Sequence, residues 1–276
     1  MHISTFSHRR FLISLFLLVI GLFLLGFSLG QKESNTGNDT IWIVDNSMSM
    51  AVEDIADSVQ NLNHSRLEVA RSLVMSGVHE LSGNHGVLIY ARSPGVLVPL
   101  TSDKNILDTN VANIAPVMDN GGSDMKSVFG LLASLYSTRK TPLNVILLSD
   151  GGDTGISDFP PLPEGVRLQI VGIGTESGGP ISLGYDALGQ RRYKIYQGKE
   201  VNVAYEQSNI EKLAKIYSAT VSTIENTRQI PEVLEAITPK IEIQKPESLL
   251  FILRIIGSLF ILLALIFPPY VSLRKN

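Results

Sequence analysis

Five oxygen-bearing side chains, spread over three loops, have the types and the spacing to bind a divalent cation. Asp45, Ser47 and Ser49 alternate in a loop that follows the apolar run 41–44, and residues two apart in an extended loop lie on one side. Ser123 follows a Gly-Gly pair, and Asp150 follows a second apolar run. Hard oxygen donors are the ligands that Mg²⁺ prefers, and Mg²⁺ leaves room for an outside carboxylate. The alternative is that these residues serve only as caps and turn formers.

The segments between these loops alternate between strand-like and helix-like patterns. Strands are predicted at 40–45, 86–91, 96–100, 145–149, 166–173 and 220–224, and helices at 65–81, 103–114, 124–136, 209–217 and 230–237. This alternation predicts a doubly wound α/β fold with a mostly parallel sheet and helices on both faces. Ligands bind beyond the carboxyl ends of such strands, where Asp45 and Asp150 lie. The Gly-rich stretch 176–206, with β-prone runs at 193–196 and 201–205, predicts a hairpin-like insertion.

Two apolar segments frame the predicted domain at residues 40–240. Residues 11–29 carry no charge and are about as long as a bilayer core requires. A second segment at 249–268 is interrupted only by Arg254, which is near enough to the end to snorkel to the interface. Both are predicted to be transmembrane helices, with residues 30–39 as a linker. A cleaved signal peptide is the alternative for the first, although cleavable cores usually span about 7 to 15 residues.

Basic residues flank this pair of segments on the outside. Arg9 and Arg10 precede the first, and Arg274 and Lys275 follow the second. The positive-inside rule therefore predicts cytoplasmic ends at 1–10 and 269–276, and a domain outside the inner membrane of a bacterium, in the periplasm. The absence of cysteine is compatible with an oxidising compartment. A net charge of −3 provides no reason to expect nucleic acid as a partner.

Enzymatic motifs are weak in this chain. Ser123-x-x-Lys126 and Ser137-x-x-Lys140 match the nucleophile motif of penicillin-binding proteins and β-lactamases, but the Lys-Thr-Gly partner motif is missing. The Gly-x-Gly at 172–174 lacks the following helix start that would receive a phosphate. We therefore predict that the chain is not an enzyme, with acyl transfer as the remote alternative.

The five donors, in this order, resemble the metal-ion-dependent adhesion site (MIDAS) of a von Willebrand factor A (VWA) domain. The stretches 66–71, 86–91, 98–103 and 172–181 are similar to the bacterial Bat-type, aerotolerance-associated membrane proteins. Ser123 stands where many A domains have Thr, and residues 219–221 replace a Gly-Gly turn. Both are departures from the family pattern.

This resemblance, which covers residues 41–237, implies a VWA fold with one Mg²⁺ or Mn²⁺ bound by Asp45, Ser47, Ser49, Ser123 and Asp150. It implies that a partner's Asp or Glu completes the coordination shell. It also implies joint action with other VWA membrane proteins and a MoxR-type AAA+ ATPase in assembly, maturation or stress tolerance. The alternative is a structural membrane-complex subunit whose metal site is weak or unused.

Overall fold

The chain divides into two units in the computed structural model. One is Asn35–Pro239, and the other combines Met1–Ser34 with Lys240–Asn276. The structure describes residues 14–24, 39–57, 59–119, 122–152, 158–238 and 249–266. The predicted linker except Asp39, the two charged ends, and residues 11–13, 25–29 and 267–268 of the two apolar segments lie outside the described residues.

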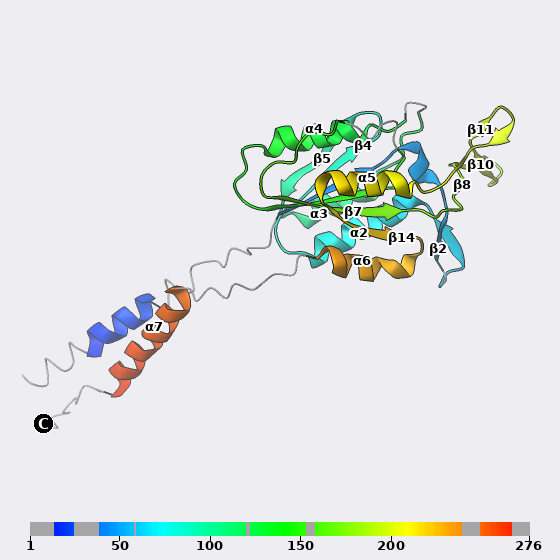
Figure 1. The fold of residues 1–276 in the computed structure, drawn as a ribbon. Helices are drawn as coiled ribbons and strands as arrows, with labels where there is room; N and C mark the ends of the chain where they lie inside the picture. The colour runs from blue at the N-terminus through cyan, green and yellow to red at the C-terminus, as the bar shows by residue number, and fades with distance from the viewer. Residues whose placement is uncertain are drawn as a thin grey trace, which may run out of the picture. The chain divides into compact units, whose positions relative to one another are not determined.

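The larger unit is built on a six-stranded sheet with the order β14-β7-β6-β1-β4-β5 (Figure 1). Five strands run parallel, and β5 pairs antiparallel with β4. The mostly parallel sheet and the β4–β5 hairpin confirm the predicted fold class. The strands are β1 Asp39–Asp45, β4 His85–Tyr90, β5 Pro94–Thr101, β6 Leu143–Ser149, β7 Val166–Ile173 and β14 Thr220–Ile224.

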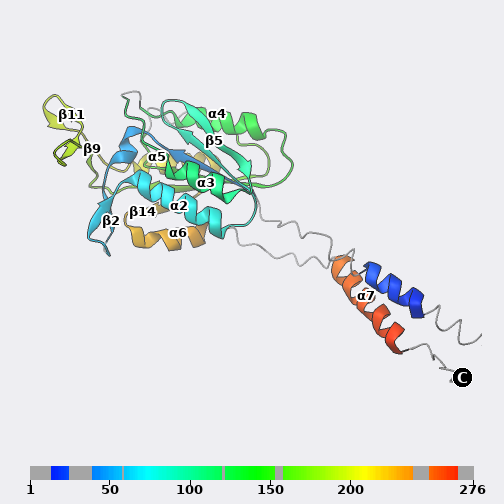
Figure 2. The same cartoon turned by 180° about the vertical axis from the view of Figure 1, so that it is seen from behind.

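Helices cover both faces of this sheet (Figure 2). Successive residues of β1 alternate between two hydrophobic cores: Trp42 and Val44 pack on one face, and Ile41 and Ile43 on the other. Because both faces are covered, the strand is an unbroken apolar run. The first core is closed by α2 (Arg66–Glu80), α3 (Lys104–Ala112) and α6 (Ile230–Ile237), and the second by α4 (Met125–Tyr136) and α5 (Gln207–Tyr217).

Three of the predicted helix starts are confirmed by their caps, whereas α5 (Gln207–Tyr217) begins two residues before its predicted start. Ser65 begins α2 with a capping box, in which its hydroxyl accepts from the Glu68 N–H and its own N–H donates to the Glu68 carboxylate. Asp103 and Asp124 cap α3 and α4. The end predicted for α3 at Ile114 was wrong by two residues. Ile114 is outside the helix but still packs in the first core, and this apolar contact extended the helical pattern in the sequence.

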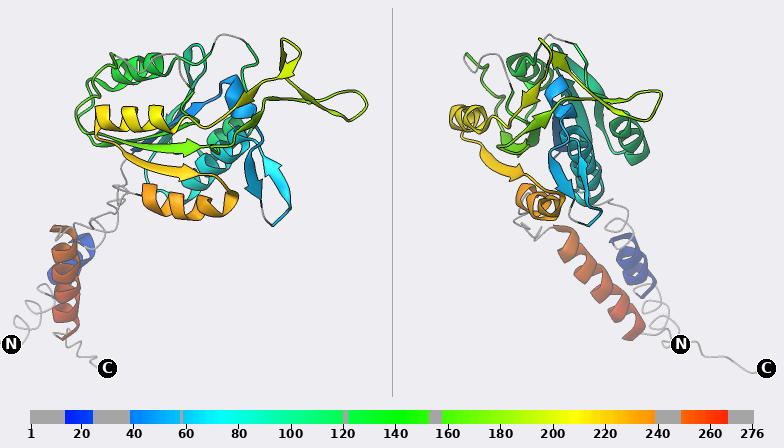
Figure 3. Two further views of the ribbon diagram at one scale, coloured as in Figure 1. Left: turned by 45° about the vertical axis from the view of Figure 1, so that its right-hand side comes forward. Right: turned by 90° about the vertical axis from the view of Figure 1, so that its right-hand side faces the viewer.

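The predicted insertion between β7 and α5 forms three small antiparallel pairs (Figure 3). The run predicted at 193–196 is split, because the Lys194 N–H donates to the Ile181 carbonyl at 2.9 Å. Only part of the run predicted at 201–205 is a strand. The pairs are β8 Gly179–Pro180 with β13 Asn202–Val203, β9 Ser182–Tyr185 with β10 Arg191–Tyr193, and β11 Ile195–Tyr196 with β12 Lys199–Glu200.

Several short elements have no counterpart in the predictions. The 3-10 helix η1 (Met48–Ala51) and the hairpin of β2 (Ile55–Asp57) and β3 (Leu62–His64) follow β1, and η2 (Thr227–Gln229) precedes α6. Val52, just after η1, bridges to Ile181 of the insertion. The insertion therefore packs against the loop that carries the candidate serines.

The smaller unit contains a helix at residues 14–24 and α7 (Leu249–Ile266). The two helices are in close contact at Gly21, because a Cβ there would lie 2.7 Å from Ile261 Cγ1 and 2.9 Å from the Gly257 carbonyl. Within the part of the chain that the structure describes, no helix combines the length and the apolar character needed to cross a membrane. The two predicted membrane spans stay predictions.

Candidate metal centre

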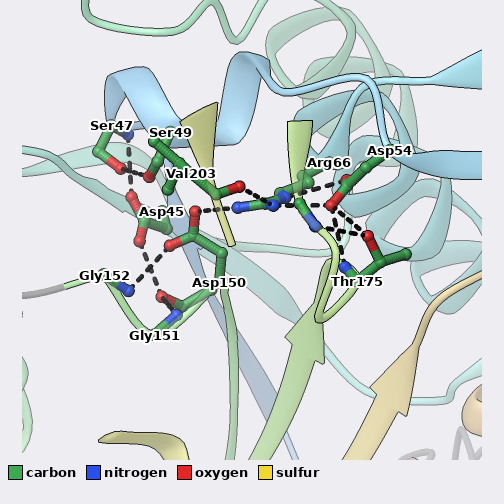
Figure 4. A network of polar contacts seen from close by, with 12 residues as sticks. Asp45, Ser47, Ser49, Asp54, Arg66, Asp150, Gly151, Gly152, Thr175 and Val203 are labelled. Carbon is green, nitrogen blue, oxygen red and sulfur yellow. Dashed lines mark hydrogen bonds and ion pairs between the residues drawn. The ribbon is translucent and has the colours of Figure 1, made fainter. Parts of the chain in front are cut away.

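The candidate site lies at the carboxyl edge of the central sheet, between β1 and β6. Asp45 is the last residue of β1, and Asp150 follows the last residue of β6. The two strands are parallel neighbours, so both carboxylates reach the same edge. Figure 4 shows them together with Ser47 and Ser49.

Asp45 is fully buried and held by three donors. Its Oδ1 accepts from the Ser47 N–H at 2.9 Å, and its Oδ2 accepts from the hydroxyls of Ser149 at 2.8 Å and Tyr90 at 3.1 Å. Burial and the negative charge of Asp150 nevertheless raise the pKa of Asp45 from 3.8 to about 7. The pKa of Tyr90 is also raised, by its own burial and by the charge of Asp45, so its hydroxyl remains a donor.

The two serines of the first loop lie side by side. Ser47 stands at the N-cap position of η1 without a side-chain cap hydrogen bond, Ser49 lies inside η1, and their hydroxyl oxygens are 3.1 Å apart. Because the loop turns into η1 at Met48, the serines meet within a turn, although the sequence predicted an extended segment. Their placement on one side is confirmed.

Gly152 lies where the first loop and the Asp150 loop approach each other closely. A Cβ at this residue would lie 3.1 Å from Asp150 Oδ1 and 3.6 Å from Ser49 Oγ. The hydroxyl of Ser123, a buried residue, donates to the Gly152 carbonyl. The structure therefore gathers all five predicted residues around Gly152, and any larger residue at this position would enter the space between the donors.

Arg66 is a buried neighbour of this site that the sequence analysis did not predict. Its side chain is 0% exposed, and its Nη1 donates to Asp150 Oδ2 at 2.7 Å. Its Nε and Nη2 donate to the two carboxylate oxygens of Asp54, at 3.0 and 2.7 Å. The other oxygen of Asp150, Oδ1, accepts from the Gly152 N–H at 2.9 Å. One oxygen of Asp150 is therefore paired with the Arg66 guanidinium, and the other is bound to the Gly152 N–H.

Two other residues at the site, Tyr90 and Ser149, were not predicted, although the sequence contains partial signals for them. Tyr90 is the register partner of Asp45 across the β1–β4 pair, which follows once the strand order is known. Ser149 directly precedes Asp150 as a polar residue at the end of an apolar run. Nothing in the sequence distinguishes Arg66, at the first turn of a helix, from an exposed residue.

The donor set fits a small divalent cation. It offers two carboxylates and three hydroxyls, all oxygen, as Mg²⁺ and Mn²⁺ prefer. The raised pKa of Asp45 reflects two buried carboxylates in proximity, a repulsion that a bound cation would relieve. Among the described residues, no cluster of three or more His, Cys, Asp or Glu side chains could hold a metal ion. Binding here would accordingly depend on the serine hydroxyls.

Comparison with known proteins identifies the class of the larger unit. Residues 40–152 match the family model of the von Willebrand factor type A domain. The matched range begins in β1 and ends at Gly152, so it contains all five candidate ligands. The chain carries a VWA domain.

Solved structures with the same fold include two bacterial proteins. One is a conserved hypothetical protein, BatB from Bacteroides thetaiotaomicron, with a TM-score of 0.58 and 19% identity over 73% of this chain and 97% of that one. The other is an aerotolerance-related membrane protein from Bacteroides fragilis, with a TM-score of 0.59 and 18% identity over 73% of this chain and 96% of that one. The predicted resemblance to a Bat-type VWA protein is confirmed at the level of the fold.

A curated relative comes from Borreliella burgdorferi and is itself an uncharacterized protein. It is 25% identical over 193 residues, which cover 64% of this chain and 53% of that protein. The chain thus matches about half the length of this relative.

Proposed function

We propose that this chain is a membrane-anchored VWA domain that binds Mg²⁺ or Mn²⁺ at a MIDAS-type site and uses it for adhesion to another protein. The observation that carries the proposal is the arrangement around Gly152, where two buried carboxylates and three hydroxyls converge at the carboxyl edge of the sheet. The proposed ligands are Asp45, Ser47, Ser49, Ser123 and Asp150.

Each residue has a defined task in this proposal. The hydroxyls of Ser47, Ser49 and Ser123 bind the cation, while Asp45 and Asp150 balance its charge. The donors from Ser149 and Tyr90 hold the Asp45 carboxylate in a single orientation. A divalent cation balanced by these two carboxylates would keep a coordination position open to a partner's Asp or Glu.

The proposed action is adhesion rather than catalysis. The Ser123-x-x-Lys126 motif places a buried serine, bonded to the Gly152 carbonyl, next to an exposed lysine. Ser137 and Lys140 are both exposed at the end of α4. Neither pair has the hydrogen-bonded nucleophile and base that acyl transfer requires.

Membrane anchoring is supported by the surface of the smaller unit. Its two helices expose large apolar side chains, with Phe23 70% exposed and Leu259 58% exposed, and such surface is costly in water. We propose that residues 11–29 and 249–268 are the anchors, with both ends of the chain cytoplasmic and the VWA domain outside the inner membrane. The fold shared with Bat-type proteins supports a role with other VWA membrane proteins and a MoxR-type ATPase in assembly, maturation or stress tolerance.

Thermal unfolding of the larger unit, residues 35–239, in increasing Mg²⁺ tests the metal site. We expect the melting temperature to rise with millimolar Mg²⁺ in the wild type and in Asp103→Asn, an exposed carboxylate variant remote from the site. The rise should be absent from Asp45→Ala and Asp150→Ala. An equal response in all four proteins, or no response in any, would contradict the proposal and favour a structural subunit with an unused site.

A phosphatase fused near residue 120 tests the topology in cells. Alkaline phosphatase folds only after export, so we expect activity from this fusion and none from a fusion at the C-terminus. The reverse pattern would overturn the proposed orientation.

A further inference from the structure

Arg66 occupies a position that its own helix does not favour. It is the first residue of α2, where the helix dipole disfavours a positive charge. Its side chain is nonetheless completely buried, which is rare for arginine unless its charge is paired. The buried charge of Arg66 is therefore stabilised by residues outside its own helix, the carboxylates of Asp54 and Asp150.

The guanidinium donates four hydrogen bonds, three to carboxylate oxygens and one to a backbone carbonyl. Besides Asp150 Oδ2 and both oxygens of Asp54, its Nη2 donates to the Val203 carbonyl at 2.8 Å. Asp54 in turn accepts from the N–H and hydroxyl of Thr175, at 2.9 and 3.0 Å. Figure 4 shows that this network continues from the site to the two ends of the insertion.

We propose that Arg66 is the resident cation of the site, and that its pairing with Asp150 sets how tightly the site binds a divalent ion. The inference rests on the proposed function, since it concerns the regulation of the same site. The guanidinium pairs with Asp54 through Nε and Nη2 and presents Nη1 to Asp150 as the positive end of that pair. It thereby keeps Asp150 in place without metal, and it repels an ion that binds to the same carboxylate.

The effect of removing Arg66 follows from where its charges lie. Asp54 binds the guanidinium through Nε and Nη2, whereas Asp150 binds it through Nη1. The positive end of the Arg66–Asp54 pair is therefore directed at Asp150. At an effective dielectric constant of about 20, replacing this pair by a neutral one strengthens the attraction of Asp150 for a divalent ion by at least about tenfold.

The test replaces the pair as a unit, Arg66→Met with Asp54→Asn, so that no buried charge is left unpaired. The control is Arg139→Met with Asp39→Asn, which removes the ion pair at 2.6 Å at the start of β1, outside the site. Calorimetric titration with Mn²⁺ gives the dissociation constant, and thermal unfolding reports separately on the loss of the Thr175 and Val203 contacts.

We expect the Arg66 double variant to bind Mn²⁺ at least about tenfold more tightly than the wild type, while the Arg139 double variant binds as the wild type does. Binding by the variant alone would support the role of Arg66 and contradict the proposed function of the wild type. Unchanged or weaker binding by the variant, with measurable binding by the wild type, would overturn the role of Arg66 and leave the proposed function intact. No binding by either protein would overturn both. If the variant fails to fold, Arg66→Gln with Asp54→Asn replaces it, because glutamine removes the charge and keeps hydrogen-bond donors for the Asp150 carboxylate. We expect tighter Mn²⁺ binding there too, and unchanged binding would overturn the role of Arg66.

Discussion

Asp45 is expected to destabilise the metal-free fold, and Asp45→Asn tests this. Burial and the charge of Asp150 raise its pKa from 3.8 to about 7. A shift of this size corresponds to a destabilisation on the order of 4 kcal/mol once the carboxyl is ionised in both states. Asparagine keeps the shape and an oxygen for the Ser47 N–H, but it disturbs the hydroxyl donors of Tyr90 and Ser149. We therefore expect Asp45→Asn to raise the free energy of unfolding by about 2 kcal/mol at pH above about 7.

The sign of the pH dependence follows from the raised pKa. Between pH 3.8 and about 7, folded Asp45 holds a proton that the unfolded chain has released. The wild type therefore becomes more stable as the pH falls through this window, and the advantage of Asp45→Asn shrinks with it. Urea unfolding with a chelator present, at pH about 8 and about 5, measures both effects.

Asp103→Asn is the matched control for this prediction. Asp103 is an exposed carboxylate that caps α3, and asparagine caps a helix about as well as aspartate. Its substitution should not alter the pH dependence. The reasoning is refuted if Asp45→Asn is no more stable than the wild type at pH about 8, or if its advantage is the same at both pH values.

The remaining predictions concern the core. Gly77→Ala should lower the free energy of unfolding by about 1–3 kcal/mol, because its Cβ would lie 2.3 Å from the ring of the buried Trp42. Gly130→Ala, where a Cβ meets nothing within 4 Å, should instead raise it by up to about 1 kcal/mol, and equal urea midpoints for the two variants would contradict the packing argument. Burial lowers the pKa of His85, so stability should fall as the pH drops below about 6.5. Urea unfolding in the Asp45→Asn background isolates this effect, and an acid-independent midpoint would argue against it.

The inner strands β1 and β6 could be predicted from the sequence because they are buried along almost their whole length. The predicted bounds of β7, β14 and α6 also match the structure. The β2–β3 hairpin was missed because its strands have three residues each, too few for any periodicity. The insertion was recognised as irregular, but its pairings were not, because backbone contacts such as Lys194 to Ile181 leave no trace in side-chain pattern.

Four of the five candidate ligands were predicted because their loops follow β1 and β6, whose ends share one edge of the sheet, whereas Ser123 lies in the loop between α3 and α4. What the sequence could not show is the charge environment of that edge. The contact between Arg66 and Asp150 joins residues 84 positions apart and depends on α2 packing in the same core as Trp42 and Val44 of β1. The same holds for the close approach of Gly152 to Asp150 and Ser49. The local sequence pattern predicted which oxygen donors could bind a cation. The tertiary structure determines how the charges of Asp45 and Asp150 are balanced.

The most direct test of the metal site is anomalous diffraction from crystals of residues 35–239 grown with Mn²⁺. The account predicts one Mn²⁺ peak beside Gly152, bonded to the hydroxyl oxygens of Ser47 and Ser49, and no such peak in crystals of Asp45→Ala. Wild-type crystals without a peak at this position, at millimolar Mn²⁺, would contradict the account.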